Sequence, residues 1–270
     1  MTSPTATELA GGHGRLALHR WGGADATFVA VLVHGYGEHA RRYDHVAQAL
    51  VDAGAAVYAA DHLGHGESDG ERVSISDMED LVADTARVVE RAAGEHPGLP
   101  VVMLGHSLGG MVAARYGQRP DHGLTALVLS APVIGGNPDL LGMVDLPEIP
   151  DVPIDPSWLS RDPEVGRAYG DDPLVWHGPF KRETLQAIIA AIDAIAAGGD
   201  LGDLPTLWIH GEQDFLAPLA QARPAVERIR GRVFEERVYP GARHEVLNEV
   251  NKDEVIDDVL AFLRSALNGR

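Results

Sequence analysis

Residues 101–113 read VVMLGHSLGGMVA and place one serine, Ser107, between glycines at 105 and 109. The pattern Gly-x-Ser-x-Gly is short and weak by itself, but its flanks have the form of a strand, a sharp turn and a helix. Glycines beside such a turn let the strand and the helix approach closely, so that a hydroxyl projects from a strained position. The stretch therefore predicts a nucleophilic serine. The alternative is an ordinary turn in which Ser107 caps the helix.

Strand-like and helix-like segments alternate on both sides of this turn. Apolar runs typical of strands covered on both faces occupy 28–34 and 55–61, and further strands are indicated at 101–105, 124–130, 205–211 and 232–240. Helical patterns occupy 41–54, 76–98, 108–118, 218–230 and 252–267, and a glycine turn between 7–10 and 15–21 indicates a β-hairpin. The alternation predicts an α/β protein with a mainly parallel, doubly wound sheet.

The alternation breaks between Pro132 and about Gly199, where prolines and glycines are frequent and one clear helix is indicated at 181–198. Because the alternation then resumes, we expect residues 133–199 to form a helical cap inserted into a core of residues 1–132 and 200–270. A long disordered loop is the alternative, but the apolar helix needs a surface to cover.

A serine hydroxyl needs a base to accept its proton and an acid to orient that base. In this kind of fold the partners follow in the order serine, acid, histidine. Asp214 and His244 each follow a buried strand, at the carboxyl edge where open α/β sheets place their sites. They are the predicted acid and base, with Glu212 in the same loop as the main rival for the acid.

Attack on a carbonyl also needs N–H donors for the oxyanion. One is expected to be the backbone amide of Leu108, the residue after the nucleophile. The other is expected from the turn after strand 28–34, where Gly35 and Gly37 let the backbone approach the substrate, so the Tyr36 amide is predicted.

Composition excludes several classes of partner. The chain has 270 residues, 45% hydrophobic and 23% charged, which is a globular balance. A formal net charge of −18 repels phosphates, so we expect no nucleic-acid partner and at most transient contact with lipid surfaces. No secretory signal or membrane-spanning run is evident, so we expect a cytoplasmic protein. Whether it is a monomer or a weak dimer stays open.

The absence of cysteine excludes thiol catalysis and cysteine-bound zinc. Histidines crowd two loops, at positions 34, 39, 62 and 65, but neither H-x-H-x-D-H nor H-E-x-x-H occurs. We therefore expect no metal and no cofactor, and interpret these histidines as hydrogen-bonding anchors of their loops.

Longer stretches resemble the monoacylglycerol lipase, or lysophospholipase-like, family of α/β-hydrolases. They are VLVHGYGEHARRYDHVAQAL, ADHLGHGESDGERV, LGHSLGGMVAARY, LSAPV, SRDPEVGRAYGDDPL, WIHGEQDFLAP and YPGARHEVLNE, spread over about residues 13 to 266. The H-G-x-G-E-H and D-H-x-G-H-G-x-S blocks are more specific than the serine pentapeptide. The resemblance implies the α/β-hydrolase fold and the same triad and oxyanion donors chosen above.

The resemblance also implies a polar pocket for a glycerol head. Glu38 and Arg42 would organise this pocket, His106 would line it, and Glu164 and Tyr169 would reach the substrate hydroxyls. Such hydroxyls need paired donors and acceptors in an otherwise apolar site. Glu38 and Arg42 are also suited to a structural ion pair, and the two roles are compatible.

Together these features predict a serine hydrolase that cleaves monoacylglycerols, a small lipid ester substrate, through an acyl-enzyme. The segment 132–158 is rich in proline and short for a lid of this family. This leaves open a general carboxylesterase or a lysophospholipase acting on other single-chain esters. A protein of this fold that only binds ligands is expected to lack a triad member or an oxyanion glycine, and here all are present.

Overall fold

The protein is built around one eight-stranded sheet of order β1-β2-β4-β3-β5-β6-β7-β8, seen in a computed structural model that describes residues 4–269. The strands are β1 (Thr5–Ala10), β2 (Arg15–Trp21), β3 (Phe28–Val33), β4 (Ala55–Ala60), β5 (Val101–His106), β6 (Leu124–Ser130), β7 (Thr206–Gly211) and β8 (Phe234–Tyr239). Strands β3 to β8 are mutually parallel, whereas β2 is antiparallel to both β1 and β4. The predicted hairpin and mainly parallel sheet are confirmed.

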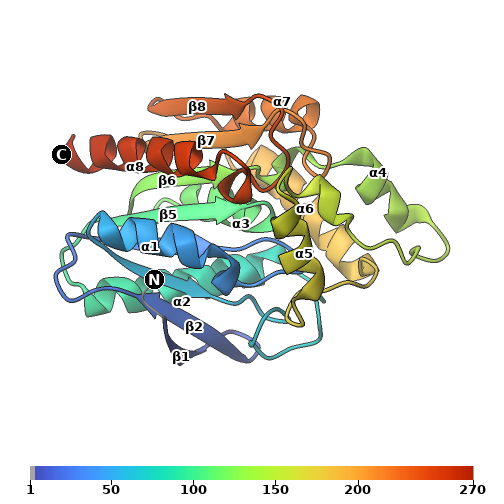
Figure 1. Cartoon of the computed structure of the whole chain (residues 1–270), viewed down its shortest axis with the longest axis horizontal. Coiled ribbons are helices and arrows are strands. Elements are labelled where there is room, and N and C mark those ends of the chain that lie inside the picture. The colour runs from blue at the N-terminus through green and yellow to red at the C-terminus, as the bar shows by residue number, and fades with distance from the viewer. Residues whose placement is uncertain (1–3, 270) are drawn as a thin grey trace.

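Helices cover both faces of this sheet. Helices α1 (Asp44–Asp52) and α8 (Lys252–Asn268) pack on one face (Figure 1), and α2 (Met78–Glu95), α3 (Leu108–Gly117) and α7 (Leu219–Ile229) pack on the other. The central strands β3, β5, β6 and β7 are buried along their whole length, which explains their unbroken apolar runs. Within residues 4–269, no helix is both long and apolar enough to cross a bilayer.

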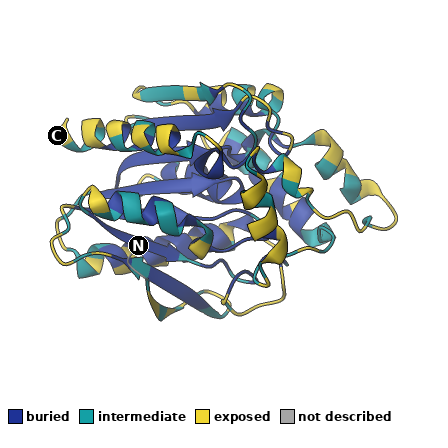
Figure 2. Cartoon of the chain, viewed as in Figure 1, coloured by how far each residue is buried: buried dark blue, intermediate teal, exposed yellow. Residues whose placement is uncertain are grey.

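The segment between β6 and β7 lies beyond the carboxyl ends of the parallel strands, at the right of Figure 1. It contains η2 (Val133–Gly135), α4 (Pro138–Leu141), η3 (Gly142–Asp145), η4 (Pro156–Trp158), α5 (Pro163–Asp171) and α6 (Arg182–Ala197). Much of its surface, around α4 in particular, is exposed (Figure 2). Residues 1–3 and 270, the outer ends of the predicted core, lie outside the described residues.

Helix α5 is the main difference from the sequence-based expectation of one clear helix in this segment. Its apolar residues are few, so periodicity does not reveal it. Its start is nevertheless encoded, because the Asp162 side chain accepts a hydrogen bond from the Glu164 backbone N–H and Pro163 occupies the first turn.

Candidate active site

Ser107 lies in a strained turn between β5 and α3. Its φ of 57° and ψ of −117° are unusual for a residue with a side chain. The turn demands glycine on both sides: a Cβ on Gly105 would lie 2.2 Å from the Gly109 oxygen, and one on Gly109 would lie 2.1 Å from the Val33 oxygen. The Ser107 side chain makes no capping bond to α3, which argues against a simple helix cap.

His244 connects Ser107 to Asp214. Its Nε2 lies 2.9 Å from the Ser107 Oγ, and its Nδ1 lies 2.8 Å from Asp214 Oδ2. The three side chains come from the loops after β5, β7 and β8, and all are buried. The structure thus brings together the three residues that the sequence predicted.

The loop after β7 holds Asp214 rigidly and separates it from Glu212. Asp214 Oδ1 accepts hydrogen bonds of 2.8 Å from the backbone N–H groups of Leu216 and Ala217, which leaves Oδ2 for His244. Glu212 is exposed instead and accepts a bond from the Gly241 N–H at 2.9 Å. Of the two rival acids, only Asp214 contacts the histidine.

The electrostatics of the three residues suit proton transfer from a serine. Burial opposes the charge on Asp214, but His244, His210 and the Ala217 backbone N–H hold the pKa of its carboxyl below the usual range. Burial also opposes a charge on His244, yet Asp214 raises the pKa of its imidazole above the usual value. His106, whose ring centroid lies 4.8 Å from that of His244, is different: burial and His244 lower its pKa to about 3, so it stays neutral.

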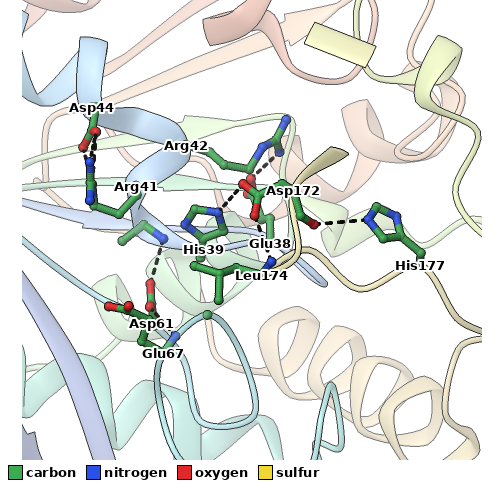
Figure 3. Close-up of polar contacts among 12 residues, drawn as sticks. Glu38, His39, Arg41, Arg42, Asp44, Asp61, Glu67, Asp172, Leu174 and His177 are labelled. Carbon is green, nitrogen blue, oxygen red and sulfur yellow. Dashed lines mark hydrogen bonds and ion pairs between the residues drawn. The ribbon is translucent and has the colours of Figure 1, made fainter. Parts of the chain in front are cut away.

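The loop after β3 carries Tyr36 to the same place. Tyr36 and Leu108 both line the cavity at Ser107. Leu108 is the first residue of α3, where backbone N–H groups have no acceptor within the helix. The other side of the loop is bonded to the segment between β6 and β7, because Gly37 O accepts the Trp176 N–H at 2.7 Å and His39 Nε2 lies 2.9 Å from Asp172 Oδ2 (Figure 3).

A buried ion-pair cluster forms the polar end of the cavity. Arg42 Nη1 donates to Glu38 Oε2 and to Glu245 Oε1, each at 2.6 Å, and Nη2 donates to Glu245 Oε2 at 2.9 Å. Burial disfavours the guanidinium, but the two carboxylates raise its pKa. The Arg42 Cζ also lies 5.1 Å from the centre of the Tyr169 ring. One cation between two carboxylates leaves the cluster with an excess of negative charge.

The rest of the cavity is apolar. It holds about 710 Å³ of space between its lining atoms, part of which is open to solvent. Most apolar lining comes from the segment between β6 and β7: Val133, Leu140, Leu141, Ile154, Leu159, Phe180, Leu185 and Ile188. The cavity at Ser107 therefore combines a largely apolar wall with a charged cluster.

Of the predicted pocket residues, Glu38, Arg42, His106 and Tyr169 line this cavity, but Glu164 does not. The Glu164 carboxylate is exposed and pairs with Arg167. Five residues along a helix correspond to roughly 140° around its axis, so the turn that directs Tyr169 inward directs Glu164 to solvent. The structure therefore removes Glu164 from the candidate site.

Glu245 is a site residue that the sequence analysis missed. It is buried, and it binds Arg42 across 203 positions of the chain. Its one sequence signal is its place directly after the candidate base.

Three of the crowded histidines bind the backbone of the two loops that carry them, His34 and His65 each within its own loop and His62 across to the loop after β3. Ring nitrogens of His34, His62 and His65 each contact a backbone carbonyl, at 2.8, 3.1 and 3.1 Å respectively. In the part of the chain that the structure describes, no three His, Asp or Glu side chains gather to hold a metal ion.

The sheet order, the strained turn at Ser107 and the serine–histidine–aspartate contacts define the α/β-hydrolase class of serine hydrolases. Comparisons with known proteins agree with this class. Residues 24–251 match the family model described as "Serine aminopeptidase, S33". A monoacylglycerol lipase from Mycolicibacterium smegmatis is 40% identical over 252 residues, which cover 90% of each chain. A human monoglyceride lipase is 32% identical over 80% of this chain and 75% of its own length.

Among solved structures, the Paleococcus ferrophilus monoacylglycerol lipase aligns with a TM-score of 0.79 at 26% identity, over 93% of this chain and 99% of its own. The chain belongs to the monoacylglycerol lipase-like family of α/β-hydrolases, which are serine hydrolases of carboxylic esters.

Proposed function

We propose that this protein hydrolyses monoacylglycerols to fatty acid and glycerol. Ser107 Oγ attacks the ester carbonyl while His244 Nε2 takes its proton, and Asp214 holds the imidazole in the required orientation. The Tyr36 and Leu108 backbone N–H groups stabilise the oxyanion. His244 then gives the proton to the departing glycerol oxygen, and a water molecule activated by His244 releases the fatty acid. The 2.8 and 2.9 Å contacts that join the three side chains carry this proposal.

The two ends of the cavity support a single-chain ester of a polyol. The apolar chamber accepts one acyl chain, and the charged end presents donors and acceptors to uncharged hydroxyls. Arg42 and Tyr169 are proposed to contact those hydroxyls, with Glu38 and Glu245 holding Arg42 in place. The excess negative charge of the cluster disfavours a phosphate in the same position, which favours a monoacylglycerol over a lysophospholipid.

We also propose that residues 133–199 act as a cap on a core of residues 1–132 and 200–270. The apolar lining that this segment contributes supports that role. We propose that the chamber accepts a single acyl chain and excludes the second chain of a diacylglycerol.

Replacement of Ser107 tests the central assignment. We expect Ser107→Ala to keep the circular dichroism and melting temperature of the wild type and to lose nearly all monoacylglycerol hydrolysis, whereas Ser265→Ala, on the exposed side of α8, keeps both. A serine-directed phosphonate should label Ser107 alone in the wild type. Wild-type turnover in Ser107→Ala, or an adduct elsewhere, contradicts the nucleophile.

The choice of substrate needs a panel. We expect monoacylglycerols to be cleaved faster than diacylglycerols, lysophosphatidylcholine and an aminoacyl p-nitroanilide, the last because a family description names an aminopeptidase. Faster cleavage of the lysophospholipid or the anilide would replace the proposed substrate.

A further inference from the structure

The peptide unit between Gly35 and Tyr36 is fixed on both sides of Gly35. The Gly35 N–H donates to Glu38 Oε1 at 2.6 Å, and the Gly35 carbonyl lies 2.8 Å from Nδ1 of the preceding side chain, His34. This peptide carries the backbone N–H of Tyr36, the proposed oxyanion donor. Its orientation therefore decides where that N–H points.

A third contact settles which nitrogen of His34 holds the proton. The backbone N–H of His62 donates to His34 Nε2 at 2.9 Å. A backbone N–H only donates, so Nε2 is the unprotonated acceptor. The proton of the neutral ring is therefore on Nδ1, and it is donated to the Gly35 carbonyl. Burial and the neighbouring histidines lower the pKa of His34, so the ring remains neutral.

A trans peptide directs its C=O and N–H to opposite sides. No cis peptide occurs among the described residues, so the Gly35 carbonyl and the Tyr36 N–H point in opposite directions. We propose that His34 is a positioning residue that aims the Tyr36 N–H at the oxyanion by holding the Gly35 carbonyl on the far side of the peptide. This inference rests on the proposed ester hydrolysis.

The surroundings of His34 restrict any other arrangement. The side chain is buried, and its ring centroid lies 4.2 Å from that of His62. The His34 carbonyl lies 3.1 Å from His62 Nε2, so the two residues are bonded twice. A Cβ on Gly109 would lie 2.4 Å from the same carbonyl. The loop that carries one proposed donor therefore rests directly on the start of α3, which carries the other.

Two variants of His34 distinguish a role in positioning the Gly35–Tyr36 peptide from a role in packing alone. In His34→Asn the amide nitrogen takes the place of Nδ1 and keeps the donor to Gly35, but the acceptor for His62 is lost. In His34→Gln the amide oxygen takes the place of Nε2 and keeps that acceptor, but the donor to Gly35 is lost. Each variant keeps one of the two bonds, so the two should lose similar stability.

We expect different kinetics from this matched pair. Loss of one oxyanion donor costs about 10²–10³ in kcat, so a misdirected donor in His34→Gln should lower kcat on a monoacylglycerol by about 10–10²-fold with little change in KM. A trifluoromethyl ketone, which forms a tetrahedral adduct, should lose affinity in parallel. His34→Asn should retain kcat within about fivefold of the wild type. Equal losses of kcat in the two variants would overturn the proposal.

A measurement on the wild-type enzyme covers the case in which neither variant folds. The ¹⁵N chemical shifts of the His34 ring should show a protonated Nδ1 and an unprotonated Nε2, and the opposite tautomer would overturn the proposal. Failure of the proposed function is distinguishable, since the wild type would then show no ester hydrolysis and no phosphonate adduct whatever the tautomer of His34.

Discussion

The buried cation Arg42 gives the sharpest test of the polar end of the cavity. The Arg42→Met substitution keeps much of the side-chain volume but leaves Glu38 and Glu245 facing the same buried position without a positive charge. These three side chains are 10%, 4% and 4% exposed, so solvent screens them little. Removing one member of a buried pair costs about 3–5 kcal/mol, and at about 2 °C per kcal/mol for a chain of this size the melting temperature should fall by about 6–10 °C.

Its neighbour Arg41 provides the control. Arg41 pairs with Asp44 (Figure 3), but the side chains of the two residues are 45% and 31% exposed. An exposed pair contributes about 0–1 kcal/mol, so Arg41→Met should shift the melting temperature by about 2 °C or less. The double variant Arg42→Met/Glu245→Gln removes one excess carboxylate. Its loss of unfolding free energy should therefore be smaller than the sum of the losses in the two single variants.

Urea unfolding and kinetics on two substrates measure these effects. The kcat/KM of Arg42→Met should fall further for a monoacylglycerol than for p-nitrophenyl butyrate, which has no glycerol head. Two results would contradict an energetically coupled, buried cluster. One is an equal loss of unfolding free energy in Arg42→Met and Arg41→Met, and the other is a loss in the double variant equal to the sum of the losses in Arg42→Met and Glu245→Gln.

Three further substitutions test the nucleophile turn, the acid and the charge beside the base. In Gly109→Ala the new Cβ meets the Val33 carbonyl at 2.1 Å, so the turn must shift, and we expect a loss of about 10²-fold in kcat; an unchanged kcat contradicts the steric argument. Asp214→Asn should keep the fold but lower kcat by about 10⁴-fold, because the asparagine would hold His244 in the wrong tautomer. Near-normal turnover would contradict the assignment of Asp214 as the acid. Burial lowers the pKa of His244, and Asp214 followed by Glu245 raises it. Glu245→Gln should therefore lower this pKa and move the acid limb of kcat/KM to lower pH; movement to higher pH would contradict the assignment.

The core of the site could be predicted from sequence because its signals are local. The parallel strands β3, β5, β6 and β7 are buried along their whole length and read as continuous apolar runs, which marks where each strand ends. Ser107 and Asp214 follow such ends, and His244 follows the edge strand β8, so one rule about the carboxyl edge of the sheet identified all three. The strained turn was recognisable from its glycines together with the strand before it and the helix after it.

The polar pocket was less predictable because its contacts join distant segments. Nothing local indicates that Glu245 meets Arg42, 203 positions away. Helix α5 was missed because few of its residues are buried. Without knowing which side of this helix faces the cavity, one cannot tell from the sequence that Tyr169 points inward and Glu164 outward. A motif match supplied both candidates, and only the helix geometry separates them.

Two parts of the chain contribute different kinds of residue to the cavity. The loops after β3, β5 and β8 supply almost all its charged and reacting groups, whereas residues 133–199 supply most of the apolar wall. Changes in that wall therefore alter the fit of the acyl chain without replacing a reacting group. The two parts are nevertheless bonded, because the Trp176 N–H donates to Gly37 O at 2.7 Å and the Glu245 N–H donates to Leu159 O at 2.8 Å. A displacement of either wall segment would thus reach the loop of the proposed oxyanion donor or the loop of the proposed base, so acyl-chain fit and the rate of the chemical step should be coupled through these two contacts.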